Sequence, residues 1–219
     1  MKRSSILAHR GLFANEQEKN SATALERALN KGFGIETDLR DLNGKIVIAH
    51  DPPKENPLPP SLEWLLGAVN SSKYSGRIAL NIKSDGLSSL IETLLQSSTI
   101  DSSRVFAFDM SVPDTLSYLK STIPFYSRVS EHEPAPVFQE EAEGVWIDSF
   151  DGSCQQVELA KDFIARGMRV TIVSSELHKR DHKSLWNEIL ESKICFSPLF
   201  EICTDYPMEA DKTFTHQNQ

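Results

Sequence analysis

The sequence predicts an α/β fold, a (β/α)8 TIM barrel with a β-hairpin extension after the second strand. Short apolar, β-branched runs alternate with stretches of helical spacing along the chain. This pattern is typical of parallel sheets, because parallel strands need crossover connections. Eight such strand–helix units, counted without the hairpin, suggest a closed barrel. The chain has 219 residues, so we expect a trimmed version of a fold that typically takes about 250.

Each expected strand is a short apolar run, and each expected helix has apolar residues three or four positions apart. The strands are expected at residues 6–8, 35–42, 78–82, 105–108, 125–129, 145–150, 170–173 and near Ile202. The helices are expected at residues 24–29, 62–69, 87–96, from Ser111 onward, 155–166 and 184–190. An acidic loop, 131–143, follows the fifth of these strands.

Cap and turn residues support several boundaries. Asn20 stands where a helix N-cap belongs, and Gly32 is a typical helix stop. Asn43-Gly44 separates the strand at 35–42 from a further run at 45–49. Because Asn-Gly is the strongest short hairpin signal, these two runs are expected to pair antiparallel.

The chain is expected to form one domain. A doubly wound open sheet is the alternative fold, but no GxGxxG motif follows the first strand. The proline-rich segment 52–60 could pass for a linker, yet the residues before it hold too few elements to fold alone. We therefore expect a single barrel over residues 1–210 and a polar C-terminal tail over 211–219.

Composition limits the partners. The chain carries 31 acidic and 23 basic residues, a net charge of −8, without a basic cluster that would bind nucleic acid. It lacks an apolar run long enough for a transmembrane segment, and its N-terminal apolar stretch is too short for a secretory signal. Three cysteines without CxxC spacing favour reduced thiols. We expect a cytoplasmic protein that acts on a small molecule.

Functional residues of a parallel barrel collect at the C-terminal ends of its strands. The polar residues at the expected ends are His9, Arg10, Glu36, Asp38, Asn81, Lys83, Asp109, Glu131, Asp148, Ser174 and Asp205. A two-residue turn pairs Leu42 with Lys45 and so brings His50 opposite Thr37. Since side chains alternate along a strand, Glu36 and Asp38 share one face beside this second histidine.

Each of these residues has an ordinary structural explanation by itself, such as a surface histidine or a solvated strand end. Two imidazoles, two adjacent carboxylates and two cations at one barrel mouth together indicate a phosphate-ester site. Carboxylates hold a hard divalent cation that neutralises phosphate oxygens. One histidine can take the proton of the nucleophile while the other protonates the departing alkoxide.

Several segments in order resemble the glycerophosphodiester phosphodiesterase family, part of the wider group of barrels related to phosphatidylinositol-specific phospholipase C. They are Ala8-His9-Arg10-Gly11, Asn20-Ser21, Ile35-Glu36-Thr37-Asp38-Leu39, Asn43-Gly44, Ile48-Ala49-His50-Asp51 and Thr204-Asp205-Tyr206-Pro207. The resemblance implies a (β/α)8 barrel that cleaves phosphodiesters with Ca²⁺ or Mg²⁺.

The same resemblance implies a role for each motif residue. His9 and His50 would be the acid–base pair, Glu36 and Asp38 metal ligands, and Arg10 and Lys83 phosphate contacts. The third ligand of the family is usually a Glu, and Asn81 stands in its place. An amide oxygen can bind Ca²⁺ or Mg²⁺ but brings no charge, so metal affinity should be lower unless Glu131 or Glu133 contributes.

Three further departures concern the substrate. The insertion that roofs the substrate in the family is reduced to residues 52–60, and Lys19 replaces the Glu of the usual ENT signature. Val173-Ser174 replaces a Trp-Thr pair, which would remove an aromatic wall.

We expect a metal-dependent phosphodiesterase that uses two-histidine acid–base catalysis on a glycerophosphodiester-like substrate. One alternative is a barrel that binds a phosphorylated metabolite or lipid headgroup without turning it over. Another is a lyase whose reaction stops at a cyclic phosphate.

Overall fold

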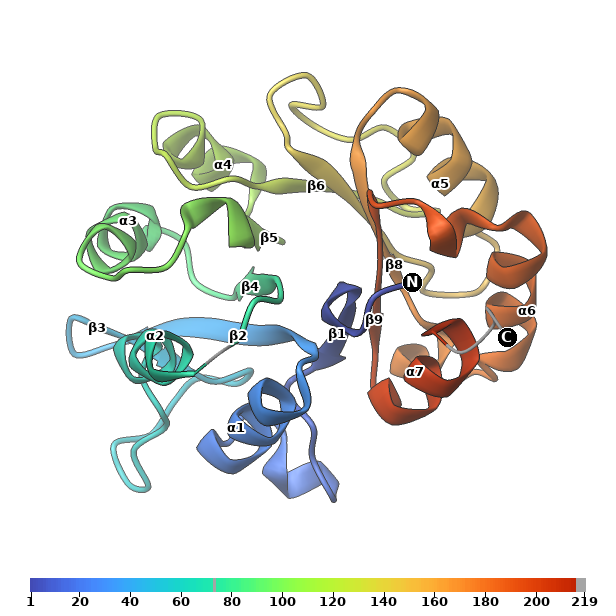
Figure 1. The fold of residues 1–219 in the computed structure, drawn as a ribbon. Coiled ribbons are helices and arrows are strands. Elements are labelled where there is room, and N and C mark those ends of the chain that lie inside the picture. The colour runs from blue at the N-terminus through green and yellow to red at the C-terminus, as the bar shows by residue number, and fades with distance from the viewer. Residues whose placement is uncertain (73, 216–219) are drawn as a thin grey trace.

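The chain folds into a nearly closed barrel of eight parallel strands, which confirms the predicted fold class (Figure 1). The computed structural model describes residues 1–72 and 74–215. Hydrogen-bonded neighbours run in the order β5-β4-β2-β1-β9-β8-β7-β6, and β3 pairs antiparallel with β2 as the predicted hairpin extension. Within the described residues, the helices surround the strands on the outside of the barrel.

The strands are β1 (Ile6–His9), β2 (Gly34–Leu42), β3 (Lys45–Ile48), β4 (Ile78–Ile82), β5 (Val105–Phe108), β6 (Tyr126–Val129), β7 (Gly144–Ile147), β8 (Arg169–Val173) and β9 (Phe200–Thr204). The α-helices are α1 (Ala22–Lys31), α2 (Leu62–Ser71), α3 (Ser88–Gln96), α4 (Val112–Tyr118), α5 (Gln156–Ala165), α6 (Lys183–Ser192) and α7 (Pro207–Thr215). Short 3-10 turns are η1 (Arg3–Ser5), η2 (Glu16–Glu18), η3 (Ser102–Arg104), η4 (Ser175–His178) and η5 (Ile194–Phe196).

The hairpin has the predicted register. Leu42 pairs with Lys45 across the turn, and Leu39 pairs with Ile48. Both turn residues, Asn43 at φ 50° and Gly44 at φ 76°, adopt the left-handed conformation that a tight two-residue hairpin turn requires.

The barrel is joined least firmly between β5 and β6. A single parallel bridge links Ala107 to Phe125, and the Ala107 N–H donates to the carbonyl oxygen of Pro124 at 2.9 Å. The other neighbouring strands share ladders of several residue pairs. This weak junction lies beside the site described below.

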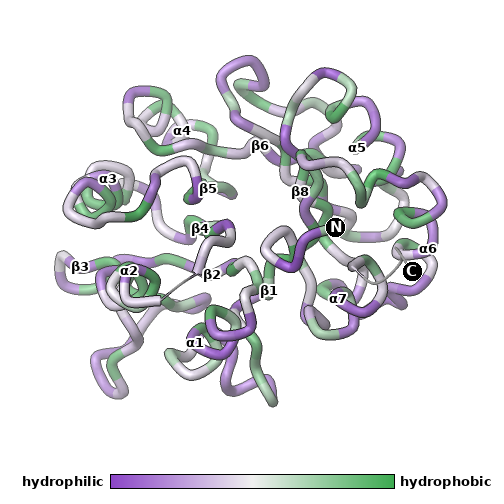
Figure 2. Tube along the Cα trace, viewed as in Figure 1, coloured by the Kyte–Doolittle hydropathy of each residue, from purple (hydrophilic) through white to green (hydrophobic). Residues whose placement is uncertain are grey.

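Apolar side chains form two layers. The larger layer fills the space between the strands and the helices, and the strands are accordingly among the most apolar segments (Figure 2). The smaller layer plugs the barrel interior and consists of Leu7, Ala79, Phe106, Phe108, Tyr126, Trp146, Val173 and Cys203. Because the interior is filled with side chains, a ligand can enter only above this plug.

Two predicted boundaries are wrong in ways that matter for the site. The N-cap of α1 is Ser21, whose Oγ accepts from the Ala24 N–H at 3.2 Å, and Asn20 is buried in the barrel mouth instead. The strand expected at 145–150 ends as β7 at Ile147. Asp148 therefore begins a loop, and its side chain is not held in a sheet.

The segment expected as a polar tail overlaps α7. Asp211 and Phe214 are buried in this helix, and Asp211 forms an ion pair with Arg3. Phe214 packs against Trp186 of α6 with a centroid separation of 5.3 Å. The helix thus packs on the outside of the barrel beside β1 (Figure 1). Residues 216–219 lie outside the described residues.

Within the described residues, no helix is both long and apolar enough to cross a membrane. Cys154, Cys195 and Cys203 are all free thiols.

Candidate active site

A polar cavity of about 270 Å³ opens at the C-terminal ends of the strands. Its walls contain six of the seven residues that the sequence nominates for the site. The lining residues are His9, Arg10, Glu36, His50, Asn81, Lys83, Phe108, Asp109, Arg128, Trp146, Asp148, Phe150, Val173, Leu177 and His178. The seventh nominated residue, Asp38, is fully buried directly behind this wall.

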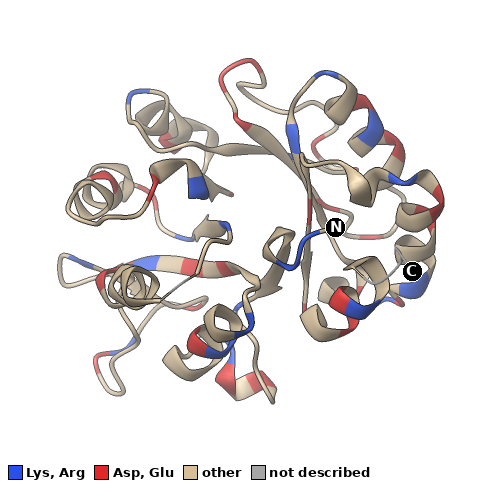
Figure 3. Ribbon diagram, in the orientation of Figure 1, with Lys and Arg blue, Asp and Glu red and all other residues tan. Residues whose placement is uncertain are grey.

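Strand alternation explains why these residues converge. Leu7, Ala79 and Phe106 belong to the interior plug. Residues two positions further along the same strands point the same way and form the next layer toward the mouth. The register places His9 beside Glu36 and Asp38 beside Asn81. Acidic positions along β2 are visible in Figure 3.

His9 is held by the residue that follows β9. Its Nδ1 lies 2.6 Å from Asp205 Oδ1, and its Nε2 lies 3.9 Å from Glu36 Oε2. Lys19 Nζ donates to the second oxygen of Asp205 at 3.1 Å. Burial alone would raise the pKa of Asp205, but the hydrogen bond and charge of His9, together with Lys19, lower it overall. An ionised Asp205 favours the tautomer with the proton on Nδ1, which leaves Nε2 as a base facing the cavity.

Lys19, at the position where the sequence departs from the family that it resembles, forms an ion pair with Asp205, whose other oxygen contacts His9 Nδ1.

Glu36 and Asp38 of β2 are fully buried, and cations compensate the charge of Asp38. Arg10 Nε lies 2.8 Å from Asp38 Oδ2, and Lys83 Nζ lies 3.5 Å from Asp38 Oδ1. Glu36 accepts the backbone N–H of Arg10 at 3.1 Å. Burial and the neighbouring Asp38 raise the pKa of Glu36. Arg10 and Lys83, which also line the cavity, can therefore reach a ligand while remaining held by Asp38.

Asn20 orients Asp38. Its Nδ2 donates to Asp38 Oδ2 at 2.7 Å, and its Oδ1 accepts from Thr37 Oγ1 at 2.9 Å. The backbone of Asn20 is left-handed at φ 62°, as is that of Arg10 at φ 56°. Non-glycine residues in this conformation collect at functional sites, where the surrounding structure compensates the strain.

His50 lies at the rim. The strand ladder ends with Leu39 opposite Ile48, and beyond it the Ala49 N–H donates to the Asp38 carbonyl oxygen at 3.0 Å, in line with the predicted placement of His50 near Thr37. Its Nδ1 is 2.8 Å from Asp51 Oδ1, but the side chains of His50 and Asp51 are 48% and 89% exposed. This second histidine is therefore much less enclosed than His9.

The residues of β2 and β4 offer oxygen ligands to a hard cation. Asp38 Oδ1 and Asn81 Oδ1 are buried without a hydrogen-bond partner, and the two residues are paired across the strands. With Glu36 they form an all-oxygen donor set that fits Ca²⁺ or Mg²⁺. Among the described residues, no group of three His, Cys, Asp or Glu side chains is gathered in a way that could hold a metal. Neither Glu131 nor Glu133 lines the cavity.

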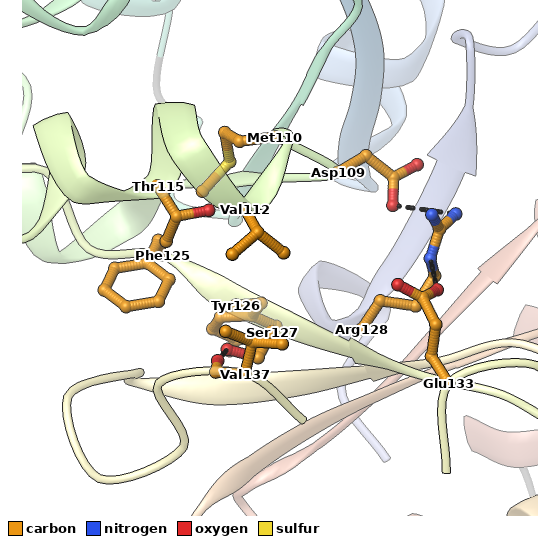
Figure 4. Close-up of a pocket in the computed structure, with 10 residues that line it drawn as sticks. All are labelled: Asp109, Met110, Val112, Thr115, Phe125, Tyr126, Ser127, Arg128, Glu133 and Val137. Atoms are coloured by element: carbon orange, nitrogen blue, oxygen red, sulfur yellow. Dashed lines mark hydrogen bonds and ion pairs between the residues drawn. The ribbon is translucent and has the colours of Figure 1, made fainter. Parts of the chain in front are cut away.

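At the C-terminal ends of β5 and β6 lie polar residues to which the sequence pattern did not assign a function. Arg128 Nη1 lies 3.2 Å from Asp109 Oδ1, and its Nε lies 2.5 Å from Glu133 Oε2 (Figure 4). Asp109 is left-handed at φ 65°, and burial raises its pKa. These residues border a small space at the weak β5–β6 junction.

Aromatic side chains form the floor and part of the rim. Phe108 and Trp146 stack with their ring centroids 3.9 Å apart, and the exposed Phe150 in the loop after β7 also lines the cavity. The expectation that this site lacks an aromatic wall is therefore wrong. Ser174 is buried and accepts the Trp186 Nε1–H at 2.7 Å, while rings from other strands supply the apolar surface.

Fold and site together define a (β/α)8 barrel with an acidic, imidazole-lined cavity at its C-terminal mouth. Solved structures with this fold include phosphodiesterases, and this chain is similar to them over nearly its whole length. A glycerophosphodiester phosphodiesterase from Agrobacterium tumefaciens is 15% identical, with a TM-score of 0.67, covering 92% of this chain and 96% of that chain.

Two other solved structures are similar. A phosphodiesterase from Oleispira antarctica, solved in complex with its product sn-glycerol-3-phosphate, is 17% identical with a TM-score of 0.70 and 96% coverage of both chains. A protein from Galdieria sulphuraria, provisionally assigned as a glycerophosphodiester phosphodiesterase, is 18% identical with a TM-score of 0.75, covering 96% of this chain and 97% of that chain. No model of a known protein family matches the chain, and no curated protein matches its sequence. At these identities the likeness establishes the fold.

Proposed function

We propose that this protein is a phosphodiesterase that cleaves a small glycerophosphodiester-like substrate in the cavity at the barrel mouth. The observation that carries the proposal is the His9–Asp205 pair beside two buried carboxylates. A site that only binds phosphate has no need of an imidazole whose tautomer is fixed with a free nitrogen facing the ligand. The fold shared with solved phosphodiesterases supports the same conclusion.

Binding of the phosphodiester is assigned to the cations of the cavity. Arg10 and Lys83 would contact the phosphate oxygens, and each remains close to Asp38. Glu36, Asp38 and Asn81 would hold a divalent cation through their oxygens. Such an ion, when bound, supplies positive charge that neutralises the phosphate.

Proton transfer is assigned to histidines. His9 Nε2 takes the proton of the attacking oxygen, which is either water or a hydroxyl of the substrate next to the phosphate. A second imidazole returns a proton to the departing alkoxide, and the resemblance and the hairpin register nominate His50 for this role. Attack by the substrate's own hydroxyl would give a cyclic phosphate, and hydrolysis would then need a second step.

The test compares the wild-type chain with His9→Asn on bis(p-nitrophenyl) phosphate and on a glycerophosphodiester, each with Ca²⁺, Mg²⁺ or a chelator. We expect turnover by the wild type and a loss of about 10²–10⁴-fold in the variant, the range for removal of a general base. Phosphorus NMR of the products distinguishes a hydrolase from a lyase, because a lyase leaves a persistent cyclic phosphate.

One observation favours the alternative function, a barrel that binds a phosphodiester without cleaving it. Asn81, which is uncharged, stands among the candidate metal ligands. Stabilisation of the wild type by phosphodiesters in thermal unfolding, together with no hydrolysis at millimolar Ca²⁺, Mg²⁺ or Mn²⁺, would support that function instead.

A further inference from the structure

The turn that follows β8 carries a carboxylate that lies outside the cavity. Glu176 belongs to the 3-10 turn η4 and is not one of the residues that line the site. Its Oε1 accepts two hydrogen bonds from the end of β9, one from the Thr204 hydroxyl and one from the Asp205 N–H at 3.1 Å. Its Oε2 accepts the hydroxyl of Ser174, the residue that follows β8. This one side chain therefore joins the ends of two neighbouring strands, β8 and β9.

The hydroxyl groups that bind Glu176 belong to a satisfied buried network. Ser174 and Thr204 are completely buried, and each donates its single hydroxyl proton to the carboxylate. Ser174 Oγ in turn accepts the Nε1–H of buried Trp186 at 2.7 Å. Thr204 Oγ1 accepts the Tyr206 N–H at 3.0 Å. Because a fully satisfied polar network is rigid, the carboxylate is anchored to α6 in the apolar core.

Asp205 lies beyond the sheet, so the strand ladder alone does not fix its side chain. β9 ends at Thr204, and Asp205 stands in the short connection to α7. Two contacts hold its carboxylate, one with His9 Nδ1 at 2.6 Å and one with Lys19 Nζ at 3.1 Å. The bond to Glu176 holds its backbone. That bond therefore sets where the carboxylate stands relative to the imidazole.

We propose that Glu176 is a positioning residue for the reaction, which holds the end of β9 so that the Asp205 carboxylate meets the imidazole of His9. This inference rests on the proposed function, in which His9 Nε2 is the base. An imidazole keeps its proton on Nδ1 only while its hydrogen-bond partner stays in place. A displaced Asp205 would free the ring to rotate or to change tautomer, and a displacement of about 1 Å can cost about 10²-fold in rate.

Two conservative variants separate the geometry of Glu176 from its charge. Glu176→Gln is uncharged, but it keeps the length of the side chain and an oxygen for the Thr204 hydroxyl and the Asp205 N–H. Glu176→Asp keeps the charge, but its side chain is one methylene shorter and cannot keep the bonds to both strands. We expect kcat on a glycerophosphodiester to stay within about 3-fold of the wild type in Glu176→Gln and to fall about 10–10²-fold in Glu176→Asp.

Nuclear magnetic resonance of the His9 ring measures the positioning without any turnover. ¹H–¹⁵N spectra, recorded at a pH where the ring is neutral, show which ring nitrogen carries the proton, and the spectrum of His9→Asn assigns the signals. We expect a protonated Nδ1 and an unprotonated Nε2 in the wild type and in Glu176→Gln. In Glu176→Asp the Nδ1 proton should exchange rapidly with water or move to Nε2.

Glu92→Ala is the matched control. Glu92 Oε1 likewise accepts a backbone N–H and a hydroxyl, both from Thr122 at 2.7 Å, but Glu92 does not line the cavity. This variant should lower the midpoint of thermal unfolding while leaving the His9 signals and kcat unchanged.

Wild-type His9 signals in Glu176→Asp would overturn the inference, whatever happens to kcat, and so would equal losses in Glu92→Ala. Loss of kcat in Glu176→Gln but not in Glu176→Asp would assign the effect to charge, which also overturns it. If Glu176→Asp does not fold, Glu176→Gln decides alone: retained His9 signals support the inference and altered signals overturn it. A wild type without turnover would overturn the proposed function, whereas the His9 spectra would still test the contact that Glu176 supports.

Discussion

Nδ1 of His9 lies 2.6 Å from Oδ1 of Asp205, so the ends of β1 and β9 are tied together by a charge-assisted hydrogen bond inside the barrel mouth. Lys19 supports the carboxylate from its other oxygen. The pair fixes the orientation of the ring and directs Nε2 toward Glu36 and the cavity. The proposed role of His9 as a base therefore depends on its contact with Asp205.

Replacing His9 by Asn should separate catalysis from folding. The Asn amide nitrogen can take the place of Nδ1 and donate to Asp205, but the side chain has no basic nitrogen where Nε2 was. We expect turnover to fall about 10²–10⁴-fold, while the midpoint of thermal unfolding stays close to that of the wild type. His9→Gln is the comparison: its amide reaches the position of Nε2 and gives up the bond to Asp205, so it should unfold at a lower temperature. Wild-type turnover in His9→Asn would exclude His9 as the base.

Asp205→Asn should make stability depend on pH with a definite sign. The pKa of Asp205 is lowered in the folded protein, so its ionised form stabilises the fold at pH values above the pKa of the unfolded chain. This stabilisation is lost as the pH falls through the folded-state pKa. At pH 7 the variant should lose about 1.5–3 kcal/mol of unfolding free energy, as expected for a hydrogen bond to a charged group.

Urea denaturation of both proteins between pH 7 and pH 3 measures this effect. The difference between wild type and Asp205→Asn should shrink toward acid pH, because the wild-type carboxyl is then protonated as well. A difference that stays constant or grows on acidification would contradict the lowered pKa of Asp205.

Variants of Asn20 and Ser21 should distinguish a residue that positions the site from a residue that only caps α1. Asn20→Ala leaves Asp38 and Thr37 without their buried partner, so we expect a loss of about 1–3 kcal/mol of unfolding free energy together with a fall in activity. Ser21→Ala removes the N-cap of α1 and should cost about 1 kcal/mol while leaving kcat unchanged. Equal effects of the two variants on kcat would mean that Asn20 acts only through the stability of this helix.

Strand periodicity and the Asn-Gly turn were sufficient to predict the barrel and the position of His50. Each is a local signal: alternation sets which side chains point inward, and a two-residue turn fixes the hairpin register. His9 and Asn81 lie at or next to the C-terminal ends of β1 and β4, and the strand register pairs them with Glu36 and Asp38 within the longer β2.

Contacts between distant segments could not be predicted in this way. Asn20 matches the pattern of an N-cap as well as Ser21 does, and only the packing of the loop against β2 separates them. His178 lies five residues beyond the end of β8, in a turn whose path no periodicity specifies. The aromatic floor was missed because Phe108 and Trp146 come from strands that resemble ordinary core strands.

Asn81→Glu should strengthen binding of a divalent cation. Asn81 Oδ1 and Asp38 Oδ1 are buried acceptors without hydrogen-bond partners on paired residues of adjacent strands, and Asn81 contributes an oxygen but no charge. A carboxylate at this position adds a negative charge to an all-oxygen donor set, which increases affinity for Ca²⁺ or Mg²⁺. We expect the dissociation constant, measured by isothermal titration calorimetry, to fall by about tenfold or more, equivalent to about 1.4 kcal/mol. Asn81→Leu, which is similar in size but has no oxygen, should weaken binding. If both variants bind Ca²⁺ and Mg²⁺ as the wild type does, the cation is not held between β2 and β4, and Arg10 and Lys83 remain the groups that neutralise the phosphate.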